Sequence, residues 1–474
     1  MREVPFEPVA VAPYARVFGA QRTARLREAA AEAGSVLAGR TIWNVNSTSA
    51  GGGVAELLHA FGPLAYSLGA DVRWLVVDGD AEFFAITKRL CTRMYGAEGD
   101  GGPLGPEQDR HYRAVLAANA AELGSRVRPG DLVIVHEAHP AGLIEAAKAM
   151  GAITVYRCHT GSDTPNEHTR DGAAFLRPHV EPADATVFLT RRHVLDWAPH
   201  PHVIPPSIDP CGPKNLVLTP DQAATILAGA GVLAGPAGSA PPQVTVPAPF
   251  GGPIRLRRQA FVVRDGQPPA PGTPMVVQVS RWDRLKDMAG VLRAFVEAAV
   301  PDSYLTLAGA DVLGVADDPE AAEMFQECEA AWAALPPPDR ARVQLVCLPM
   351  ADPRENAILV NALQQHASVV VQKSLAEGFG LTATEAMWKS RPLVASAVGG
   401  LAEQVVPGES GLLVADAHDI AATAASIRSL LLDRDLAARL GDGAHRRIAE
   451  NFLPDAHLLA WTRLINDVVG MKVA

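Results

Sequence analysis

Short apolar runs alternate with helix-like segments along the whole chain, and this alternation most limits the folds open to it. In the N-terminal half we expect strands at Thr41–Asn46, Val72–Val77, Leu132–His136, Ile153–Tyr156 and Thr186–Leu189. In the C-terminal half we expect strands at Met275–Ser280, Tyr304–Ala308, Val343–Leu348, Ser368–Gln372, Leu393–Ser396 and Leu412–Val414. Between strands, apolar residues recur at helical spacing, as in Val54–Leu68. The pattern predicts an α/β protein with two parallel sheets, each covered by helices on both faces.

The chain also divides by length and composition. Its 474 residues exceed what one ordinary hydrophobic core holds. Residues 228–274 are dense in Pro, Gly and Ala, which predicts a linker or an insertion with a short hairpin around Ile254–Arg264. We therefore expect an N-terminal domain over 1–210, a linker or insertion over 211–274, and a C-terminal domain over 275–454. The end of the chain, 455–474, has helical spacing.

Composition excludes several classes of function. A content of 48% hydrophobic and 20% charged residues is typical of a globular protein. The net charge of −10 argues against nonspecific nucleic-acid binding, which needs a basic face. The sequence shows neither a signal-peptide pattern nor an apolar run near ~20 residues, so we expect a cytoplasmic protein without a membrane partner. The five cysteines form no Cys-x-x-Cys pair, and we expect them to be buried thiols.

The segment 373–389, KSLAEGFGLTATEAMWK, carries the most specific chemical pattern. It follows a valine-rich strand and leads into a helix, and Glu377 and Glu385 flank a Gly-Phe-Gly turn. A glycine turn before a helix N-terminus offers free N–H groups to an anion. One carboxylate could then reach the hydroxyls of a ligand's sugar while the other reaches hydroxyls beyond the phosphate, as a nucleotide-sugar requires. Alone, the pattern fits a buried strand–turn–helix with two solvated glutamates equally well.

Two cations follow the first expected strand of the C-terminal half. Arg281 and Lys286 lie in VSRWDRLKD, at a strand's carboxyl end, where open parallel sheets bind ligands. A guanidinium fork and an ammonium could straddle a diphosphate and stabilise the charge that develops as it leaves. In isolation such a run is also a common solvated loop.

Three further segments fall at expected strand ends in the N-terminal half. Gly51, Gly52 and Gly53 precede a helix and would let the backbone approach a ligand, although the spacing is neither a dinucleotide nor an ATPase motif. His159 could bond a sugar hydroxyl, and a structural histidine is the alternative. The run from His136 to His139 lacks the spacing of a zinc motif, so we expect no metal there.

Taken together, these segments resemble the retaining GT-B glycosyltransferases of family 4. The resemblance implies two Rossmann-like domains with parallel sheets that face each other across an interdomain cleft, and a terminal helix that crosses back to the first domain. The family's Glu-x7-Glu, Arg-x4-Lys, histidine and glycine-loop elements are matched by Glu377 and Glu385, Arg281 and Lys286, His159, and Gly51–Gly53. Within the family the match is closer to the trehalose glycosyltransferring synthases, through segments such as VNSTSAGGGVAELLH (45–59) and PPSIDPCGPKN (205–215).

This resemblance implies roles for individual residues. The catalytic residues would be His159, Arg281, Lys286 and Glu377. The donor would bind to Gly51, Gly52, Gly53, Arg281, Lys286, Glu377, Gly378, Phe379, Gly380, Leu381, Thr382 and Glu385, with the first glutamate on the sugar and the second on the ribose. We assign the acceptor to Asn46, His136, Glu137, Arg157 and Asp163.

The expected reaction is transfer of glucose from ADP- or UDP-glucose to glucose, with retention of configuration, to form trehalose. A retaining trehalose phosphorylase, a family 4 transferase with another sugar or cyclitol acceptor, and an inactive sugar-nucleotide sensor are the alternatives. We expect no required cofactor, since the NDP-glucose is a substrate, and Mg²⁺ is the counter-ion that a diphosphate can recruit. The expected partners are small molecules and a second copy of the chain in a homodimer.

Overall fold

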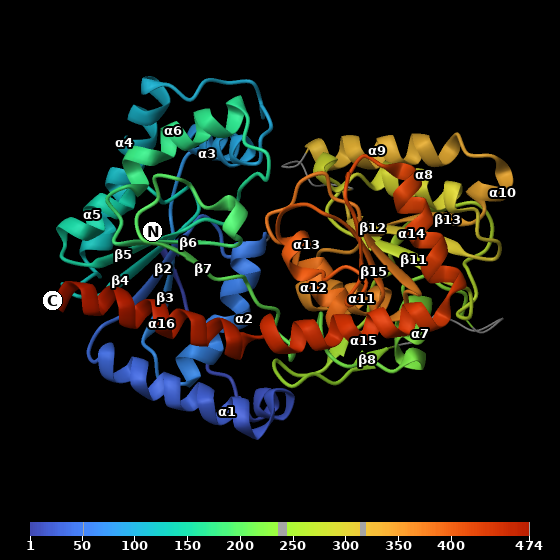
Figure 1. The fold of residues 1–474 in the computed structure, drawn as a ribbon, viewed down its shortest axis with the longest axis horizontal. Coiled ribbons are helices and arrows are strands. Elements are labelled where there is room, and N and C mark those ends of the chain that lie inside the picture. The colour runs from blue at the N-terminus through green and yellow to red at the C-terminus, as the bar shows by residue number, and fades with distance from the viewer. Residues whose placement is uncertain (51, 236–243, 313–318, 474) are drawn as a thin grey trace. The chain divides into compact units, whose positions relative to one another are not determined.

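The computed structural model describes residues 1–50, 52–235, 244–312 and 319–473, and these form two compact α/β units (Figure 1). The first unit comprises Met1–Ile208, Glu377–Phe379 and Phe452–Ala474. The second comprises Asp209–Ala376 and Gly380–Asn451. Each unit contains one large, mainly parallel sheet, so the prediction of two parallel-sheet domains is confirmed.

The first sheet has seven strands in the order β1-β3-β2-β4-β5-β6-β7. The strands are β1 (Arg2–Val4), β2 (Ile42–Asn46), β3 (Val72–Val76), β4 (Leu132–His136), β5 (Ile153–Arg157), β6 (Ala185–Phe188) and β7 (Pro201–Val203). All pairs are parallel except β1 with β3. Ile42 is in register with both Val72 and Leu132, so β2, β3 and β4 begin at one edge of the sheet and end at the other.

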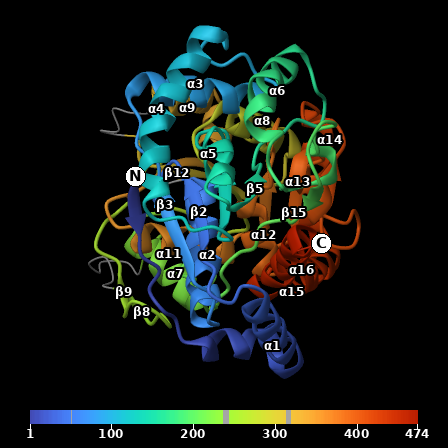
Figure 2. The ribbon, with the colours of Figure 1, turned by 90° about the vertical axis from the view of Figure 1, so that its left-hand side faces the viewer.

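Helices cover both faces of this sheet, because alternate side chains of each buried strand point to opposite faces. Val133 and Val135 join a core with helices of one face, whereas Leu132 and Ile134 join a core on the other. The first face carries α3 (Ala81–Met94), α4 (Pro106–Gly124), α5 (Leu143–Ala149) and α6 (Glu167–Val180) (Figure 2). The second carries α1 (Val11–Val36), α2 (Gly53–Ser67) and α16 (Pro454–Val473).

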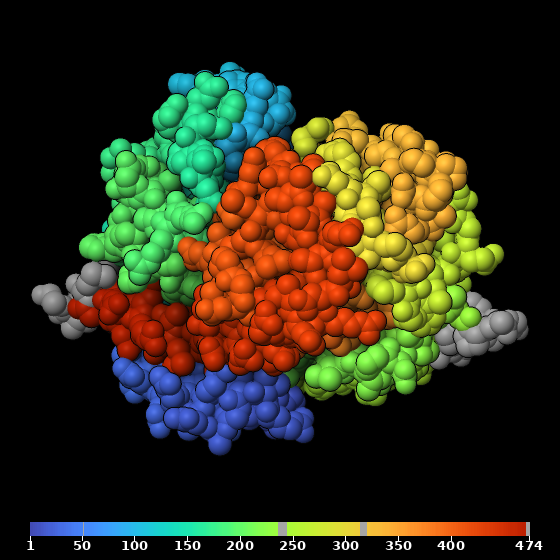
Figure 3. Space-filling view, turned by 45° about the vertical axis from the view of Figure 1, so that its right-hand side comes forward, coloured from blue at the N-terminus to red at the C-terminus, as the bar shows by residue number. Residues whose placement is uncertain are grey.

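The terminal helix α16 is therefore part of the first unit. It lies along α1, which Figure 3 shows as dark red against blue. The buried Asp455 near its start pairs with Arg22 of α1, with Nε 2.6 Å from Oδ2. Trp461, Leu464 and Ile465 fill the core beneath it.

The second sheet also has seven strands, in the order β10-β13-β12-β11-β14-β15-β16. They are β10 (Phe261–Arg264), β11 (Met275–Val279), β12 (Tyr304–Ala310), β13 (Val343–Leu348), β14 (Val369–Gln372), β15 (Leu393–Ser396) and β16 (Leu412–Val414). One face packs on α8 (Met288–Ala298), α9 (Pro319–Ala333), α14 (Ile420–Leu432) and part of α15 (Arg434–Asn451). Three further helices lie outside that core: α7 (Pro220–Gly229), α11 (Pro353–His366) and α12 (Leu381–Trp388). The short helices α10 (Pro337–Arg340) and α13 (Gly399–Gln404) also belong to this unit.

Residues 209–274, which we expected to include a linker or an insertion, lie in the second unit where they are described. Helix α7 packs on α11, and β10 pairs antiparallel with β13. The predicted hairpin around Ile254–Arg264 is wrong. Strand β9 (Ile254–Arg255) instead turns back to β8 (Thr245–Val246), and the buried carboxylate of Glu355 holds Arg258 through its backbone N–H at 2.7 Å and its guanidinium at 2.7 Å. This anchor directs the chain away from β9 and into β10.

Candidate active site

Two of the predicted donor-binding segments begin after neighbouring strands of the second sheet. The Arg281–Lys286 loop comes after β11, and the segment before Gly380 comes after β14, which pairs with β11. Gln278, on β11, joins the loops: its Nε2 donates to the Lys286 carbonyl at 2.8 Å, and its Oε1 accepts the Lys373 N–H at 3.0 Å. The Leu375 N–H also donates to the Leu285 carbonyl at 2.8 Å. The cation loop and the start of the glutamate motif are thus held side by side at one edge of the sheet.

A buried ion pair strengthens this junction. The Lys373 ammonium is 2% exposed, and it donates to the Asp287 carboxylate and, at 2.6 Å, to the Ala417 carbonyl. Asp287 has a left-handed backbone (φ 41°) and caps α8 by accepting the Gly290 N–H at 3.0 Å. A Cβ atom at Gly290 would lie 2.1 Å from the Asp287 carboxylate, so only glycine fits. Because Lys286 directly precedes Asp287, the contacts that hold Asp287 also fix the backbone position of Lys286.

Arg281 and Lys286 have different surroundings. Arg281 is 70% exposed and its Nη2 lies 2.6 Å from the Asp283 carboxylate. Lys286 ends the short helix η2 (Arg284–Lys286) and is half-buried. Asp283 caps η2 by accepting the Leu285 N–H at 2.8 Å. Both cations follow the carboxyl end of β11, as the sequence predicts.

Helix α12 begins directly after the Gly-Phe-Gly turn. Gly380 precedes it with φ 89°, a left-handed conformation that favours glycine, and Leu381 and Thr382 form its first turn. Glu385 is buried one turn further on, and its Oε1 lies 3.8 Å from Nζ of Lys214. The N-terminus of α12 and a buried carboxylate therefore occur together, as an anion site next to a hydroxyl acceptor requires.

Two lysines near Glu385 were not predicted as site residues. Lys214 belongs to the segment PPSIDPCGPKN, whose unusual sequence was the only signal. Lys389 is buried, and its Nζ donates to Asn215 Oδ1 at 3.1 Å, Gln364 Oε1 at 2.9 Å and the Glu385 carbonyl at 3.1 Å. Burial lowers the pKa of Lys389 to about 7, and the neighbouring Glu385 opposes that shift.

In the first unit, His159 ends a buried chain of hydrogen bonds. His136 Nε2 lies 3.0 Å from Asn44 Oδ1, and His136 Nδ1 lies 3.1 Å from His159 Nε2. Burial lowers the pKa of both imidazoles well below the usual value, with the Arg157 charge adding to the effect, so both rings are neutral near pH 7. Since Asn44 Oδ1 can only accept, His136 Nε2 donates, and His136 Nδ1 accepts from His159 Nε2–H. His159 therefore keeps a lone pair on Nδ1, which suits it to accept a hydrogen bond from a sugar hydroxyl.

Glu137 holds the backbone beside His159. Its own backbone is left-handed (φ 68°), and its carboxylate accepts the His159 N–H, the Thr160 hydroxyl at 3.2 Å and, more weakly, the Cys91 thiol at 3.7 Å. Burial raises the pKa of Glu137 to about 7 despite these donors. Its carboxylate is occupied by these contacts within the protein.

The remaining predicted acceptor residues have varied environments. Arg157 is wholly buried; its guanidinium lies 3.4 Å from His457 Nε2 and 5.1 Å from the centre of the Trp461 ring. Asn46 is also buried and accepts the Trp74 indole N–H at 2.7 Å. Asp163 is half-buried, 3.3 Å from His193 Nε2.

The predicted site has two glycine-rich segments, Gly51–Gly53 and the turn that contains Gly378, and glycine is favoured at Gly52 and Gly378 for different reasons. Gly51 lies outside the described residues; Gly52 caps α2 with φ 79° and Gly53 is the first residue of that helix. The turn Glu377–Phe379 groups with the first unit. A Cβ atom at Gly378 would lie 2.6 Å from the His159 carbonyl oxygen and 3.0 Å from the Tyr95 hydroxyl. Only glycine therefore permits this turn to lie against His159.

The described part of the chain, residues 1–50, 52–235, 244–312 and 319–473, offers neither a metal site nor a membrane span. No group of three or more His, Cys, Asp or Glu side chains there could hold a metal ion. None of the helices there is both long enough and apolar enough to cross a membrane.

The two parallel-sheet units are those of the GT-B glycosyltransferase fold. Solved structures with this fold match nearly the whole chain. Sucrose-phosphate synthase from Thermosynechococcus elongatus matches 91% of this chain and 100% of its own, with 19% identity and a TM-score of 0.64. The E. coli trehalose-6-phosphate protein bound with UDP-2-fluoro glucose matches 90% of this chain and 99% of its own, with 14% identity and the same TM-score of 0.64. At these identities the likeness shows the fold alone.

Sequence comparisons identify the family. Residues 44–195 match the trehalose synthase N-terminal domain, and residues 350–447 match glycosyl transferases group 1. A trehalose synthase from Pyrococcus horikoshii is 31% identical over 96% of both chains. Another from Rubrobacter xylanophilus is 32% identical over 98% of both. The chain belongs to the trehalose synthase family of GT-B glycosyltransferases, and its activity lies in trehalose metabolism.

Proposed function

We propose that this enzyme transfers glucose from ADP- or UDP-glucose to glucose with retention of configuration, giving trehalose. One observation carries the proposal: the Arg281–Lys286 loop and the start of the glutamate motif are held together at the carboxyl edge of the second sheet. The Leu375–Leu285 hydrogen bond and the Gln278 side chain make that connection. A nucleoside diphosphate-sugar needs cations for its diphosphate beside carboxylates for its hydroxyls.

The donor half of the proposal follows from these loops. Arg281 and Lys286 stabilise the diphosphate as its bond to the sugar breaks, and the backbone at the start of α12 binds the same phosphates. The buried Glu385 accepts hydrogen bonds from the ribose hydroxyls. Glu377 orients the sugar, and the turn that carries it adjoins His159 at Gly378.

The acceptor half relies on the neutral His159. Its Nδ1 lone pair accepts a hydrogen bond from a sugar hydroxyl, and its ring is fixed by His136. The acceptor hydroxyl attacks the anomeric carbon from the face that the diphosphate leaves. The departing phosphate oxygen takes the hydroxyl proton, so the reaction as proposed uses no separate protein base.

The proposal is tested by incubating the purified enzyme with ADP-glucose or UDP-glucose and a panel of free sugars. We expect trehalose and the free nucleoside diphosphate to form in equal amounts, with glucose as the preferred acceptor. Glu385→Gln, which keeps the size of the side chain, should weaken the reaction. Formation of glucose 1-phosphate from trehalose and phosphate without any nucleotide would contradict the proposal and indicate a phosphorylase.

A further inference from the structure

A cavity of about 540 Å³ lies in the first unit, at the edge of the sheet opposite to His159. Thr41, Ile42 and Val72 line it, and these residues begin β2 and β3 or directly precede them. Asn46 and His159, by contrast, are at or beyond the carboxyl ends of their strands. The cavity is therefore distinct from the candidate active site. Its volume falls in the range typical of small-molecule sites.

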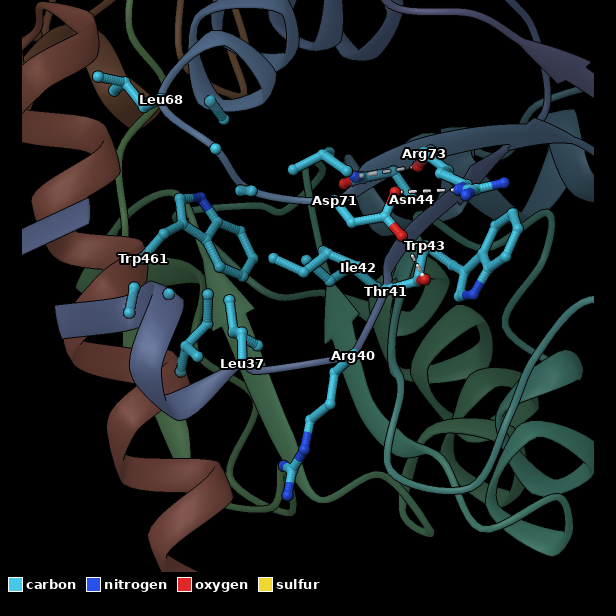
Figure 4. A pocket seen from close by; sticks show the side chains of 18 of the residues that line it. Leu37, Arg40, Thr41, Ile42, Trp43, Asn44, Leu68, Asp71, Arg73 and Trp461 are labelled. Carbon is cyan, nitrogen blue, oxygen red and sulfur yellow. Dashed lines mark hydrogen bonds and ion pairs between the residues drawn. The ribbon is translucent and has the colours of Figure 1, made fainter. Parts of the chain in front are cut away.

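The walls of one part of the cavity are apolar. Helices α1, α2 and α16 contribute Leu26, Ala33, Phe61, Ala65, Trp461 and Ile465. Figure 4 shows Leu37, Ile42 and Trp461 together at this part. Such a lining favours the hydrocarbon or aromatic body of a ligand, because burying it removes apolar surface from water.

The rest of the lining is polar, and its charged residues have a net positive charge. It includes four arginines and two acids, an excess of two positive charges, in a chain whose net charge is −10. Arg73 pairs with Asp71 at 3.1 Å, and Arg126 with Glu3 at 3.0 Å. The lining arginines, with their acids, are Arg40, Arg73, Arg126, Arg128, Glu3 and Asp71.

Some guanidinium groups of this lining lack an ion pair, or have an N–H without an acceptor, among the described residues. No carboxylate there forms an ion pair with Arg40 or Arg128. The buried Nε of Arg126 has no hydrogen-bond acceptor among the same residues. Figure 4 shows the Arg40 side chain extending separately from the Asp71–Arg73 pair. Guanidinium groups bind carboxylates, sulfonates and phosphates through paired N–H donors.

We propose that this cavity is a second ligand site, for a small organic anion with an apolar body and one carboxylate, sulfonate or phosphate group. The apolar body lies against Trp461 and Phe61, and the anionic group lies near Arg40 and Arg128. The ligand is a different chemical class from a nucleotide-sugar or a free sugar, both of which lack an apolar body of this kind.

Occupancy of the cavity is expected to affect His159. The Trp461 indole N–H, on the cavity wall, donates to His457 Nε2 at 3.0 Å. Arg157 lies 3.4 Å from that same nitrogen and 5.1 Å from the Trp461 ring centre, and it precedes His159 by two residues. A ligand that shifts the indole therefore acts on His457 and Arg157. Burial and the charges of these two residues lower the pKa of His136 and His159.

Binding is tested by isothermal titration calorimetry of the full chain with decanoate and with anilinonaphthalene sulfonate. Two partial probes serve as controls: decanol has the apolar body without the anionic group, and inorganic phosphate has the negative charge without the apolar body. We expect saturable binding of one decanoate per chain and much weaker binding of the two partial probes. Absence of saturable decanoate binding, or equal binding of decanol, would overturn the proposal.

Variants localise the binding. Ala30→Trp, at a half-buried wall position of α1, should fill the cavity and abolish decanoate binding. The double variant Arg40→Ala/Arg128→Ala should weaken it by roughly tenfold or more. Arg27→Ala, an exposed position on α1 outside the cavity lining, is the matched control and should bind as the wild type does. Unchanged binding in both cavity variants would show that the probes bind elsewhere and would refute the site.

The coupling has a separate test that depends on the proposed transfer activity. Saturating decanoate should change the rate of glucose transfer by the wild type and leave that of Ala30→Trp unchanged. An unchanged wild-type rate at full occupancy would refute the coupling. The calorimetric result does not depend on the transfer reaction, so failure of the proposed function and failure of the site are distinguishable.

Discussion

The guanidinium of Arg281 and the ammonium of Lys286 follow the same strand, but Lys286 is less exposed and its carbonyl is held by Gln278. We predict that Arg281→Ala and Lys286→Ala each slow transfer by about a hundredfold, because each cation stabilises the leaving diphosphate by on the order of 3 kcal/mol. Arg284→Ala, an exposed position in the same loop, is the control. Steady-state rates check the prediction, and wild-type turnover in either cation variant would contradict it.

The two glutamates of the motif should have separable effects. Glu385→Gln should raise the donor KM, because its bonds to the ribose form equally in the ground state and the transition state. Glu377→Gln should chiefly lower kcat, because orientation at the reacting carbon matters most in the transition state. The reverse pattern in steady-state kinetics would mean that the sugar and ribose ends of the donor are exchanged.

Glu137 should make stability depend on pH. Its folded pKa of about 7 exceeds its ordinary value of 4.5, so the native state binds the proton more tightly than the unfolded state does. The stabilisation is fully present below about pH 4.5 and is lost as pH rises to about 7, with a total on the order of 3 kcal/mol.

Urea unfolding of the wild type and Glu137→Gln across this range checks the prediction. The wild type should lose free energy of unfolding relative to the variant as pH rises, because glutamine does not titrate. A difference between the two proteins that stays constant with pH would contradict it.

At the scale of elements, the Lys373–Asp287 pair ties β14 to the start of α8. Lys373→Met should weaken binding of nucleoside diphosphate and lower kcat, because it leaves Asp287 with only the longer ion pair to Arg293, at 3.8 Å, and loosens the Lys286 loop. Asp287→Asn, which retains a capping side chain, should have a smaller effect on folding than on binding. The double variant should cost less than the sum of the single variants, since an unpaired buried charge is more costly than none. Additive losses in ADP affinity, measured by calorimetry, would contradict a direct coupling.

The buried central strands could be predicted from the sequence, whereas most of the edge strands could not; β16 (Leu412–Val414) is an edge strand that was predicted. Runs such as Val369–Gln372 are apolar because both faces of the sheet are covered, which gives them a strong signal. Strands β1 (Arg2–Val4) and β7 (Pro201–Val203) are short and partly polar, and we did not predict them. Strand β10 falls within the hairpin that we predicted, but its pairing with β13 was not predicted, because β13 lies far along the chain.

The same reasoning applies to the site. The positions of the candidate residues after β5, β11 and β14 could be predicted, because chemically specific side chains fall at expected strand ends. The partners Lys214, Lys373 and Lys389 could not, since each gains its role from residues distant in sequence. The tautomer of His159 likewise depends on Asn44, which the sequence alone does not connect to it.

At the scale of the whole molecule, the proposed reaction uses residues of both compact units. His159 belongs to the first unit and Lys286 to the second. We predict that donor binding makes the molecule more compact and protects the chain between the units from proteolysis, because excluding water prevents hydrolysis of the activated sugar. Small-angle scattering with and without ADP-glucose or UDP-glucose measures this. An unchanged radius of gyration at saturation would refute ligand-driven closure.

The central claim, a retaining glucosyl transfer to glucose, is tested most directly by following the fate of the anomeric carbon. The enzyme is given ADP-glucose or UDP-glucose isotopically labelled at that carbon, together with unlabelled glucose, and the product is examined by NMR. We predict trehalose in which the labelled carbon keeps the α configuration and forms one side of the α,α linkage. A product with the labelled carbon in the β configuration, or no disaccharide from any nucleotide donor, would contradict the account.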